Sequence, residues 1–253
     1  MTTRRSKNGS VGMSPAGPGG VTFGGRFVDC QRANLYVRTA TRVLMRIGSF
    51  LATNVRRLEK KSAGVPWELF LPPGILPEIK VRSRRSRLYH TDVISRALRQ
   101  SMARRLGRPP GSSRPDRPQT LFVRVVEDRY TLSLDSTGAP LYKRGLKSGP
   151  ARAPLRETQA AAILMAAGYD PGRPLVDPLC GSGTFSLEAA MMAKRMAPGV
   201  KRDFAFMDWP AFRESRWAFF RRSAGPWPTG FPAASRWLGP RRKPLRPDRK
   251  APA

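Results

Sequence analysis

The sequence has few cysteines, few histidines and few acidic residues, and each shortage excludes a class of protein. Its two cysteines, Cys30 and Cys180, cannot form the disulfide network that stabilises small secreted domains. With the single histidine, His90, they are too few and too scattered for a structural zinc site, so no metal is expected. No run reaches the ~18 consecutive apolar residues that cross a bilayer, and the basic start lacks the apolar core of a signal peptide. We therefore predict a reduced, cytoplasmic location with no membrane attachment.

Acidic residues are outnumbered, because 17 Asp and Glu stand against 47 Lys and Arg, a formal net charge of +30. A chain with this charge repels itself at neutral pH, and a polyanionic partner relieves the repulsion. RNA, DNA and anionic membrane surfaces are the candidate partners, whereas an enzyme that meets only small molecules is a poor first hypothesis. The apolar share of 40% supplies a core and argues against wholesale disorder.

The periodicity of apolar residues predicts two folded parts in the 253-residue chain. We expect helices at 28–38, 52–62, 91–106, 155–167 and 184–196. We expect strands at 21–23, 42–48, 78–83, 120–127, 130–135 and 174–177, with a hairpin turn at Asp128-Arg129. Within one basic stretch, the order strand, helix, strand, strand indicates a small α+β unit. Further along the chain, the order helix, strand, glycine loop, helix is typical of the start of a Rossmann-like α/β domain. A complete domain of this kind needs more strands than the sequence predicts here.

The sharpest local signal is the run Asp177-Pro-Leu-Cys-Gly-Ser-Gly-Thr184, between an expected strand and an expected helix. Its two glycines allow a tight turn and close approach of a ligand, and the helix N-terminus favours an anionic group. A dinucleotide fingerprint requires a third glycine where Ser186 stands, and a phosphate-binding P-loop requires a lysine after Gly183. An acid followed by Gly-x-Gly suits a ligand with an amino acid end, as S-adenosylmethionine has. An ordinary strand-to-helix turn is the alternative.

A basic stretch over residues 80–105 is the expected RNA contact. Arginine binds phosphate through two parallel hydrogen bonds, and an exposed tyrosine stacks on an unpaired base. The predicted RNA-binding residues are Lys80, Arg82, Arg84, Arg85, Arg87 and Tyr89. The alternative is a solvated basic surface in a chain that is rich in arginine throughout.

Several segments in one order resemble the bacterial THUMP-domain class I S-adenosylmethionine-dependent 23S rRNA guanine-N2 methyltransferases. The run Val176–Ala190 resembles the first motif of their catalytic domain, and the likeness covers about residues 20–217. The other similar segments are Ala33–Leu44, Val81–Thr91, Leu141–Gly145, Ala153–Glu157, Met196–Gly199 and Phe204–Trp209. The family's Asn-Pro-Pro-Tyr-type motif, which holds the target amino group, does not occur in this sequence.

The resemblance implies an α+β THUMP/ferredoxin-like RNA-binding module followed by the start of an α/β Rossmann-like class I methyltransferase domain, truncated within that domain. It places Asp177, Pro178, Cys180, Gly181, Gly183 and Thr184 in the loop that binds S-adenosylmethionine. The expected segments are a disordered lead-in (1–20), a partial ferredoxin-like region (21–64), a THUMP RNA-binding domain (65–150), the N-terminal part of the methyltransferase domain (151–220) and a basic Pro/Arg-rich tail (221–253). Methylation of a guanine N2 in large-subunit rRNA is the expected function. A non-catalytic RNA-binding fragment is the alternative.

Overall fold

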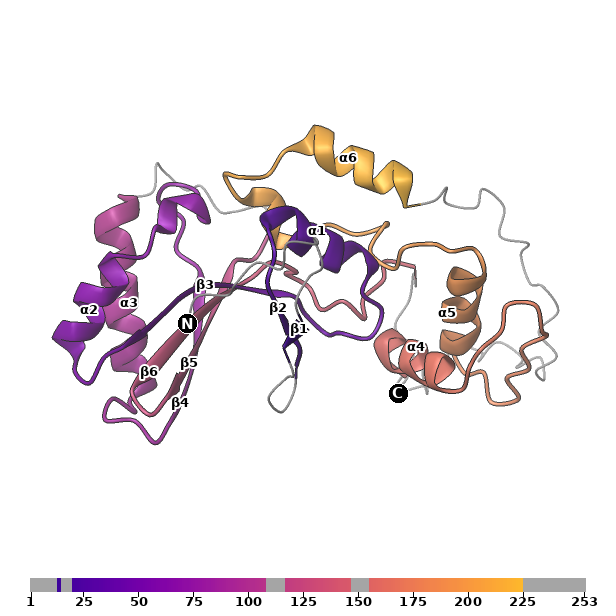
Figure 1. The fold of residues 1–253 in the computed structure, drawn as a ribbon, viewed down its shortest axis with the longest axis horizontal. Coiled ribbons are helices and arrows are strands. Elements are labelled where there is room, and N and C mark those ends of the chain that lie inside the picture. Colours follow the sequence, from indigo (N-terminus) through magenta and orange to yellow (C-terminus); the bar gives the residue numbers. More distant parts are fainter. Residues whose placement is uncertain (1–12, 15–19, 108–116, 147–154, 225–253) are drawn as a thin grey trace, which may run out of the picture.

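The computed structural model describes residues 13–14, 20–107, 117–146 and 155–224 (Figure 1). Most of the expected lead-in and of the expected tail lies outside these residues. Within the lead-in, however, Met13–Ser14 forms strand β1, which pairs with β2 (Thr22–Phe23) in an antiparallel ladder. Helix α6 (Glu214–Ser223) continues into the segment expected as the tail, where it ends at Ser223.

A four-stranded sheet forms the centre of the first folded part. Its strands are β3 (Leu44–Leu51), β4 (Glu78–Arg84), β5 (Thr120–Val126) and β6 (Arg129–Asp135), in the spatial order β3-β6-β5-β4. The β4–β5 pair is parallel, and the other two pairs are antiparallel. The expected α+β unit is therefore confirmed. The β5–β6 turn uses Glu127 and Asp128, both with positive φ, which places the turn one residue before the predicted one.

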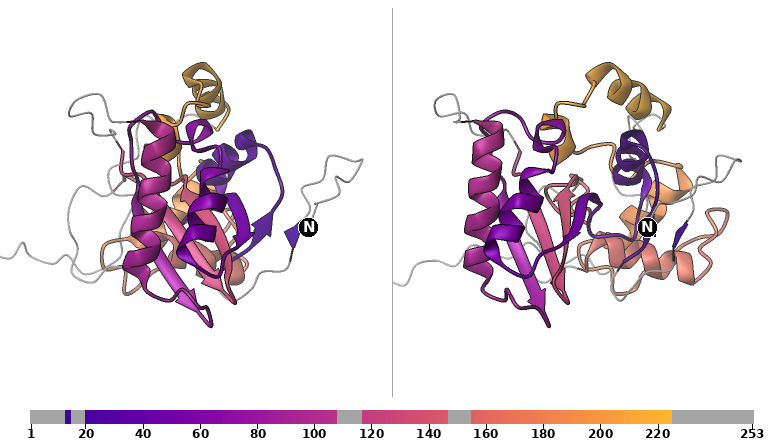
Figure 2. Two further views of the ribbon diagram at one scale, coloured as in Figure 1. Left: turned by 90° about the vertical axis from the view of Figure 1, so that its left-hand side faces the viewer. Right: turned by 60° about the vertical axis from the view of Figure 1, so that its left-hand side comes forward.

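Among the described elements, helices cover one face of this sheet (Figure 2). They are α2 (Val55–Ala63) and α3 (Thr91–Leu106), and α3 has the bounds that the periodicity predicts. In β6 apolar side chains alternate with polar ones, and in β5 every second side chain is apolar and buried, so both strands bury one face against the helices. The fully buried side chains of this core include Leu58, Leu98, Leu121 and Leu132.

The boundary expected between residues 64 and 65 runs through one sheet. Strand β3 and helix α2 precede it, yet β3 pairs with β6 along its length and α2 packs on α3. Trp67 follows α2 directly and is fully buried, and its indole N–H donates to the Ser62 carbonyl at 3.0 Å. Residues 44–107 and 117–135 therefore share one core.

The same hydrophobic core extends to join the two ends of the described chain. Helix α1 (Phe27–Tyr36) and the segment around α6 meet through aromatic side chains, with the Phe27 and Trp209 rings stacked at 5.6 Å. Phe206 lies between Phe204 and Trp217, with ring centroids 5.3 Å and 5.2 Å apart. Residues 204–220, expected in the methyltransferase domain, thus pack on the N-terminal helix, as Figure 1 shows for α6 and α1.

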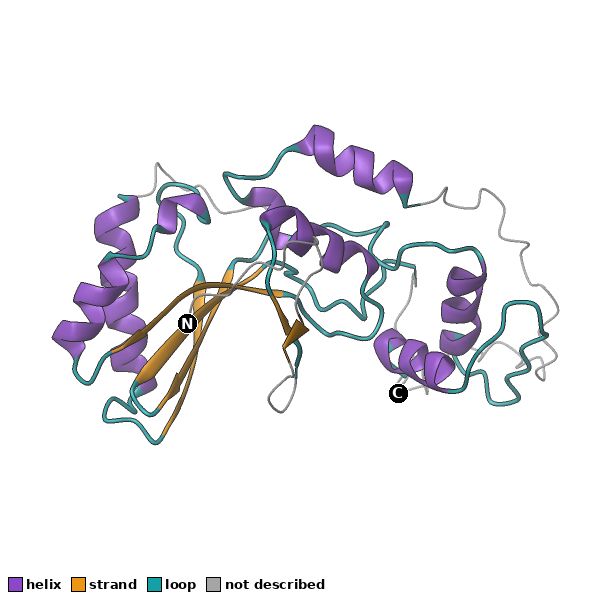
Figure 3. Ribbon diagram, in the orientation of Figure 1, coloured by secondary structure: helices purple, strands orange, loops and turns teal. Residues whose placement is uncertain are grey.

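Helices α4 (Glu157–Ala166) and α5 (Thr184–Ala193) contact each other at the far end of the molecule from α2 and α3 (Figure 1). The strand expected at 174–177 between them is wrong, because these residues form a loop (Figure 3). Leu175 and Val176 are 41% and 72% exposed. A parallel strand exists only when a neighbour supplies its hydrogen bonds, and no described residue pairs with this segment.

Candidate functional site

The glycine loop ends directly at the N-terminus of α5. Gly183 is the residue before the helix, and its φ of 73° lies in the left-handed region that glycine enters without strain. Gly181 has a φ of 52°, and a side chain there would meet only the Leu179 carbonyl, at 3.9 Å. The Gly183 N–H donates to the Cys180 carbonyl at 2.7 Å, which closes the turn. Both glycines therefore shape a loop that leaves open space next to the backbone at Gly181.

Asp177 carries a buried acceptor that the protein leaves unused. Its Oδ1 accepts a hydrogen bond from the Leu179 N–H at 3.2 Å. Its Oδ2 is buried and has no hydrogen-bond partner within the described residues. A buried carboxylate oxygen without a partner costs free energy, which a cationic donor from a ligand offsets.

Thr184 fixes the loop to the segment before α4. Its side chain is 4% exposed, and its hydroxyl donates to the Leu155 carbonyl at 3.4 Å. The Ser182 hydroxyl lies 3.3 Å from the hydroxyl oxygen of Thr184. Pro178 is exposed and Cys180 is half-buried. The six predicted cofactor residues thus lie in one turn, with Asp177 at its start and Thr184 in the helix.

A buried ion-pair cluster holds α5 to the rest of the protein. The Glu188 carboxylate accepts from Arg144 Nε at 2.9 Å, and these two side chains are 1% and 2% exposed. Arg38 approaches the other carboxylate oxygen at 3.5 Å, and burial lowers the pKa of Arg38. Arg144 also donates to the carbonyls of Arg38 and Leu141 at 2.6 Å and 2.9 Å. The predicted site residues include neither Glu188 nor the two arginines. A lone acid in the apolar helix is the signal that points to a buried cation.

Half of the predicted RNA-binding residues lie on strand β4. Lys80, Arg82 and Arg84 alternate with half-buried residues, and all three are exposed. The other three lie in the loop before α3, where the Arg87 N–H donates to Asp128 at 2.7 Å. Tyr89 in that loop is 64% exposed, and its ring lies 4.1 Å from the ring of His90. The structure therefore separates the predicted set into a strand group and a loop group.

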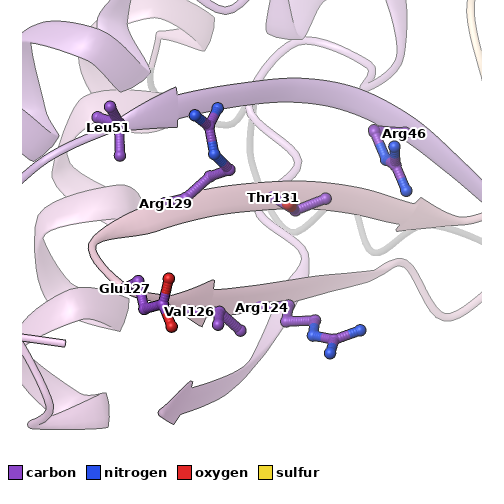
Figure 4. Close-up of a pocket in the computed structure, with 7 residues that line it drawn as sticks. All are labelled: Arg46, Leu51, Arg124, Val126, Glu127, Arg129 and Thr131. Atoms are coloured by element: carbon purple, nitrogen blue, oxygen red, sulfur yellow. The ribbon is translucent and has the colours of Figure 1, made fainter. Parts of the chain in front are cut away.

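Three exposed arginines on the same sheet face are missing from the sequence prediction. Arg124 lies beside Arg82 across the β4–β5 pair, Arg129 lies on β6 beside Val126, and Arg46 lies on β3 beside Ser133. Figure 4 shows these three arginines around an open hollow of about 430 Å³. We call the face that carries Arg46, Lys80, Arg82, Arg84, Arg124 and Arg129 the open sheet face. Strand alternation marks each arginine as outward-facing, but no sequence signal tells which strands are neighbours.

The described part of the chain lacks two other kinds of feature. None of its helices combines the length and the apolar character that crossing a membrane requires. The described residues also contain no group of three or more His, Cys, Asp or Glu side chains arranged to hold a metal ion.

Two family models match the sequence. Residues 144–226 match the family described as "RMKL-like, methyltransferase domain", and residues 14–44 match the "RlmL ferredoxin-like domain". The first match contains the glycine loop, α5 and the buried partner Arg144, whereas the second contains α1. The two matches thus cover the segment with α1 and the segment with the glycine loop, and the four-stranded sheet lies almost wholly between them.

Relatives and a solved structure agree with these matches. The chain is 34% identical over 205 residues to "Putative RNA methyltransferase YpsC" of Bacillus subtilis, covering 79% of this chain and 53% of that protein. It is 35% identical over 222 residues to "Ribosomal RNA large subunit methyltransferase K/L" of Syntrophotalea carbinolica, covering 81% of this chain and 31% of that protein. A solved structure described as "SMU.472, a putative methyltransferase complexed with SAH" matches with a TM-score of 0.68 at 32% identity, covering 81% of this chain and 55% of that one. The chain spans about half or less of the length of these proteins. In these two segments and across its relatives, the chain is thus similar to RlmL-like methyltransferases.

Proposed function

We propose that the protein holds RNA and transfers a methyl group from S-adenosylmethionine to the N2 amino group of a guanine in large-subunit rRNA. The observation that carries the proposal is the glycine loop before α5, with the buried and unpaired Oδ2 of Asp177 at its start. The family matches and the names of the relatives support the reaction class and the RNA substrate. The neighbour described with bound SAH supports the methyl donor.

The residues of the loop fit the amino acid end of S-adenosylmethionine. The free Oδ2 of Asp177 is an acceptor for an ammonium group. The N-terminus of a helix favours an anionic group, and α5 begins directly after Gly183, so a carboxylate suits this end of the loop. The bond from Thr184 to Leu155 fixes the helix start. S-adenosylmethionine, when bound, supplies an electrophilic methyl group.

We further propose a division of labour along the chain. Residues 21–150 hold RNA through the ferredoxin-like and THUMP regions, and residues 151–220 bind the methyl donor. Transfer to an exocyclic amine also requires a group that orients the amine. We assign no residue to that role, because the sequence contains no Asn-Pro-Pro run.

Substitution of Asp177 tests the donor site. In Asp177→Asn the acceptor for the ammonium loses its charge, and a hydrogen bond between charged groups contributes about 1.5–3 kcal/mol. We expect the affinity for S-adenosylhomocysteine, measured by calorimetry on the full chain, to fall roughly 10- to 100-fold.

Asp170→Asn is the matched control for this measurement. Asp170 lies in the same loop between α4 and α5, accepts from the Gly172 N–H at 2.9 Å and is exposed. This variant is expected to bind as the unchanged protein does. Failure of the unchanged protein to bind, or equal weakening in both variants, contradicts the proposed site.

A further inference from the structure

Three parallel rows of side chains that each cross the four strands carry the cations of the open sheet face, and beside the first row lie the acids Glu78 and Asp135. The register aligns Lys80 with Arg46 through Phe122 and Ser133 in the first row. In the second row, Arg82 and Arg124 are direct neighbours. In the third, Arg84 is aligned with Arg129 through Val126. Each row therefore contributes two cations to one surface.

The spacing of these rows is set by the geometry of a strand. Side chains on one face recur every second residue, so successive rows lie roughly 6.6 Å apart. Successive phosphates along a single nucleic-acid strand have a separation of this order. The regular sheet thus repeats its positive charge with a period that suits a polyphosphate backbone.

Within the described residues, little of the positive charge of this face is neutralised. Among the described residues, none of the five arginines on it lies within ion-pair distance of a carboxylate. Lys80 pairs with Glu78 at 3.2 Å, but both side chains are at least half exposed, which makes the pair weak. Glu127 is the acid that borders the hollow in Figure 4. Six cations close together, with little acidic compensation, repel one another unless a polyanion lies across them.

We propose that the open sheet face binds RNA through its backbone phosphates. Arg124 and Arg129 flank the hollow on β5 and β6, and Arg46 extends the contact to β3. This inference rests on the proposed function, because the relatives act on RNA according to their names. It assigns the contact to four strands of one sheet rather than to the continuous basic stretch 80–105. Contacts to phosphates carry no sequence information, so this face holds RNA irrespective of its sequence.

Two triple variants with the same change of charge test the location of the contact. The first is Arg46→Gln, Arg124→Gln and Arg129→Gln on the open sheet face. The matched control is Arg96→Gln, Arg99→Gln and Arg104→Gln, on the exposed side of α3, whose buried side packs on the other face of the sheet. The probe is a fluorescein-labelled single-stranded oligouridine, titrated with the full chain at several salt concentrations.

The sheet variant is expected to bind the probe roughly tenfold or more weakly, because it loses three phosphate contacts. The slope of log affinity against log salt is expected to become shallower by about 2. The α3 control is expected to stay within about threefold of the unchanged protein and to keep its salt slope. Equal losses in the two variants overturn the inference, because they assign the effect to net charge alone.

Two further measurements distinguish loss of RNA binding from unfolding and from membrane binding. Thermal melting checks that each variant is folded, and Arg124→Gln alone replaces the sheet variant if the triple change unfolds the chain. Vesicles that contain phosphatidylserine form the second arm. If the sheet variant loses vesicle binding but binds oligouridine as the unchanged protein does, the inference is overturned and the face is assigned to a membrane. Oligouridine binding by this face without any binding of S-adenosylhomocysteine leaves the inference standing and refutes the proposed function.

Discussion

Cys30 in α1 is a buried thiol whose surroundings oppose its ionisation. Burial raises its pKa from 9.0 to about 11, a hydrogen bond with Ser136 acts in the opposite direction, and the nearby charge of Asp135 raises the pKa further. Below pH 9 the thiol is protonated in the folded and the unfolded chain alike. Between pH 9 and pH 11 the unfolded chain releases this proton while the folded chain retains it. Stability therefore falls as the pH rises through this window.

We expect Cys30 to contribute on the order of 2–3 kcal/mol to the alkaline loss of unfolding free energy between pH 8 and pH 11. Tyr130, whose pKa burial raises to about 12, acts in the same direction at higher pH. Urea unfolding of the unchanged chain and of Cys30→Ala at both pH values isolates the contribution of the thiol. A loss of the same size in the two proteins contradicts this account, since the other titrating groups are common to both.

Helix α5 is the element that connects the glycine loop to the N-terminal half of the protein. Its N-terminus forms part of the loop, and Glu188 in its second turn is buried between Arg144 and Arg38. Burial of an ion pair alone is weak evidence for stability, because desolvation offsets the attraction. Removal of one partner, in contrast, leaves a buried charge without compensation.

We therefore expect Glu188→Ala to lower the free energy of unfolding by about 3 kcal/mol. The control is Glu68→Ala, which removes the acid from the exposed pair that Glu68 forms with Arg105 at 2.7 Å. This control is expected to leave the urea midpoint nearly unchanged. If both variants shift the midpoint equally, the buried cluster does not hold α5.

The elements show where sequence reasoning succeeds. Helix α3 has the predicted bounds, and β4, β5 and β6 each lie within a residue or two of theirs, because their alternation reports which face is buried. The strand expected at 174–177 fails because strand formation depends on a partner that a local pattern does not reveal. Arg46, Arg124 and Arg129 were missed for the same reason, since strand order creates the surface they share.

At the scale of the whole molecule, two clusters join segments that are distant in sequence. The aromatic side chains around Phe206 pack residues 204–220 on α1, and the ion pairs of Glu188 tie α5 to residues 38 and 144. The open sheet face and the glycine loop belong to opposite ends of this assembly (Figure 1). RNA that reaches the loop while it is held on the sheet therefore spans much of the protein. Of the positive charges behind the net charge of +30, six lie together on that face.

Methyl transfer to RNA tests the central claim most directly. The full chain is incubated with ribosomal RNA that lacks its methyl groups and with S-adenosylmethionine labelled on the methyl group, and the RNA is digested to nucleosides for mass spectrometry. The account predicts label in N2-methylguanosine, reduced in Asp177→Asn and unchanged in Asp170→Asn. Absence of label from the RNA, or label in a nucleoside other than N2-methylguanosine, would contradict it.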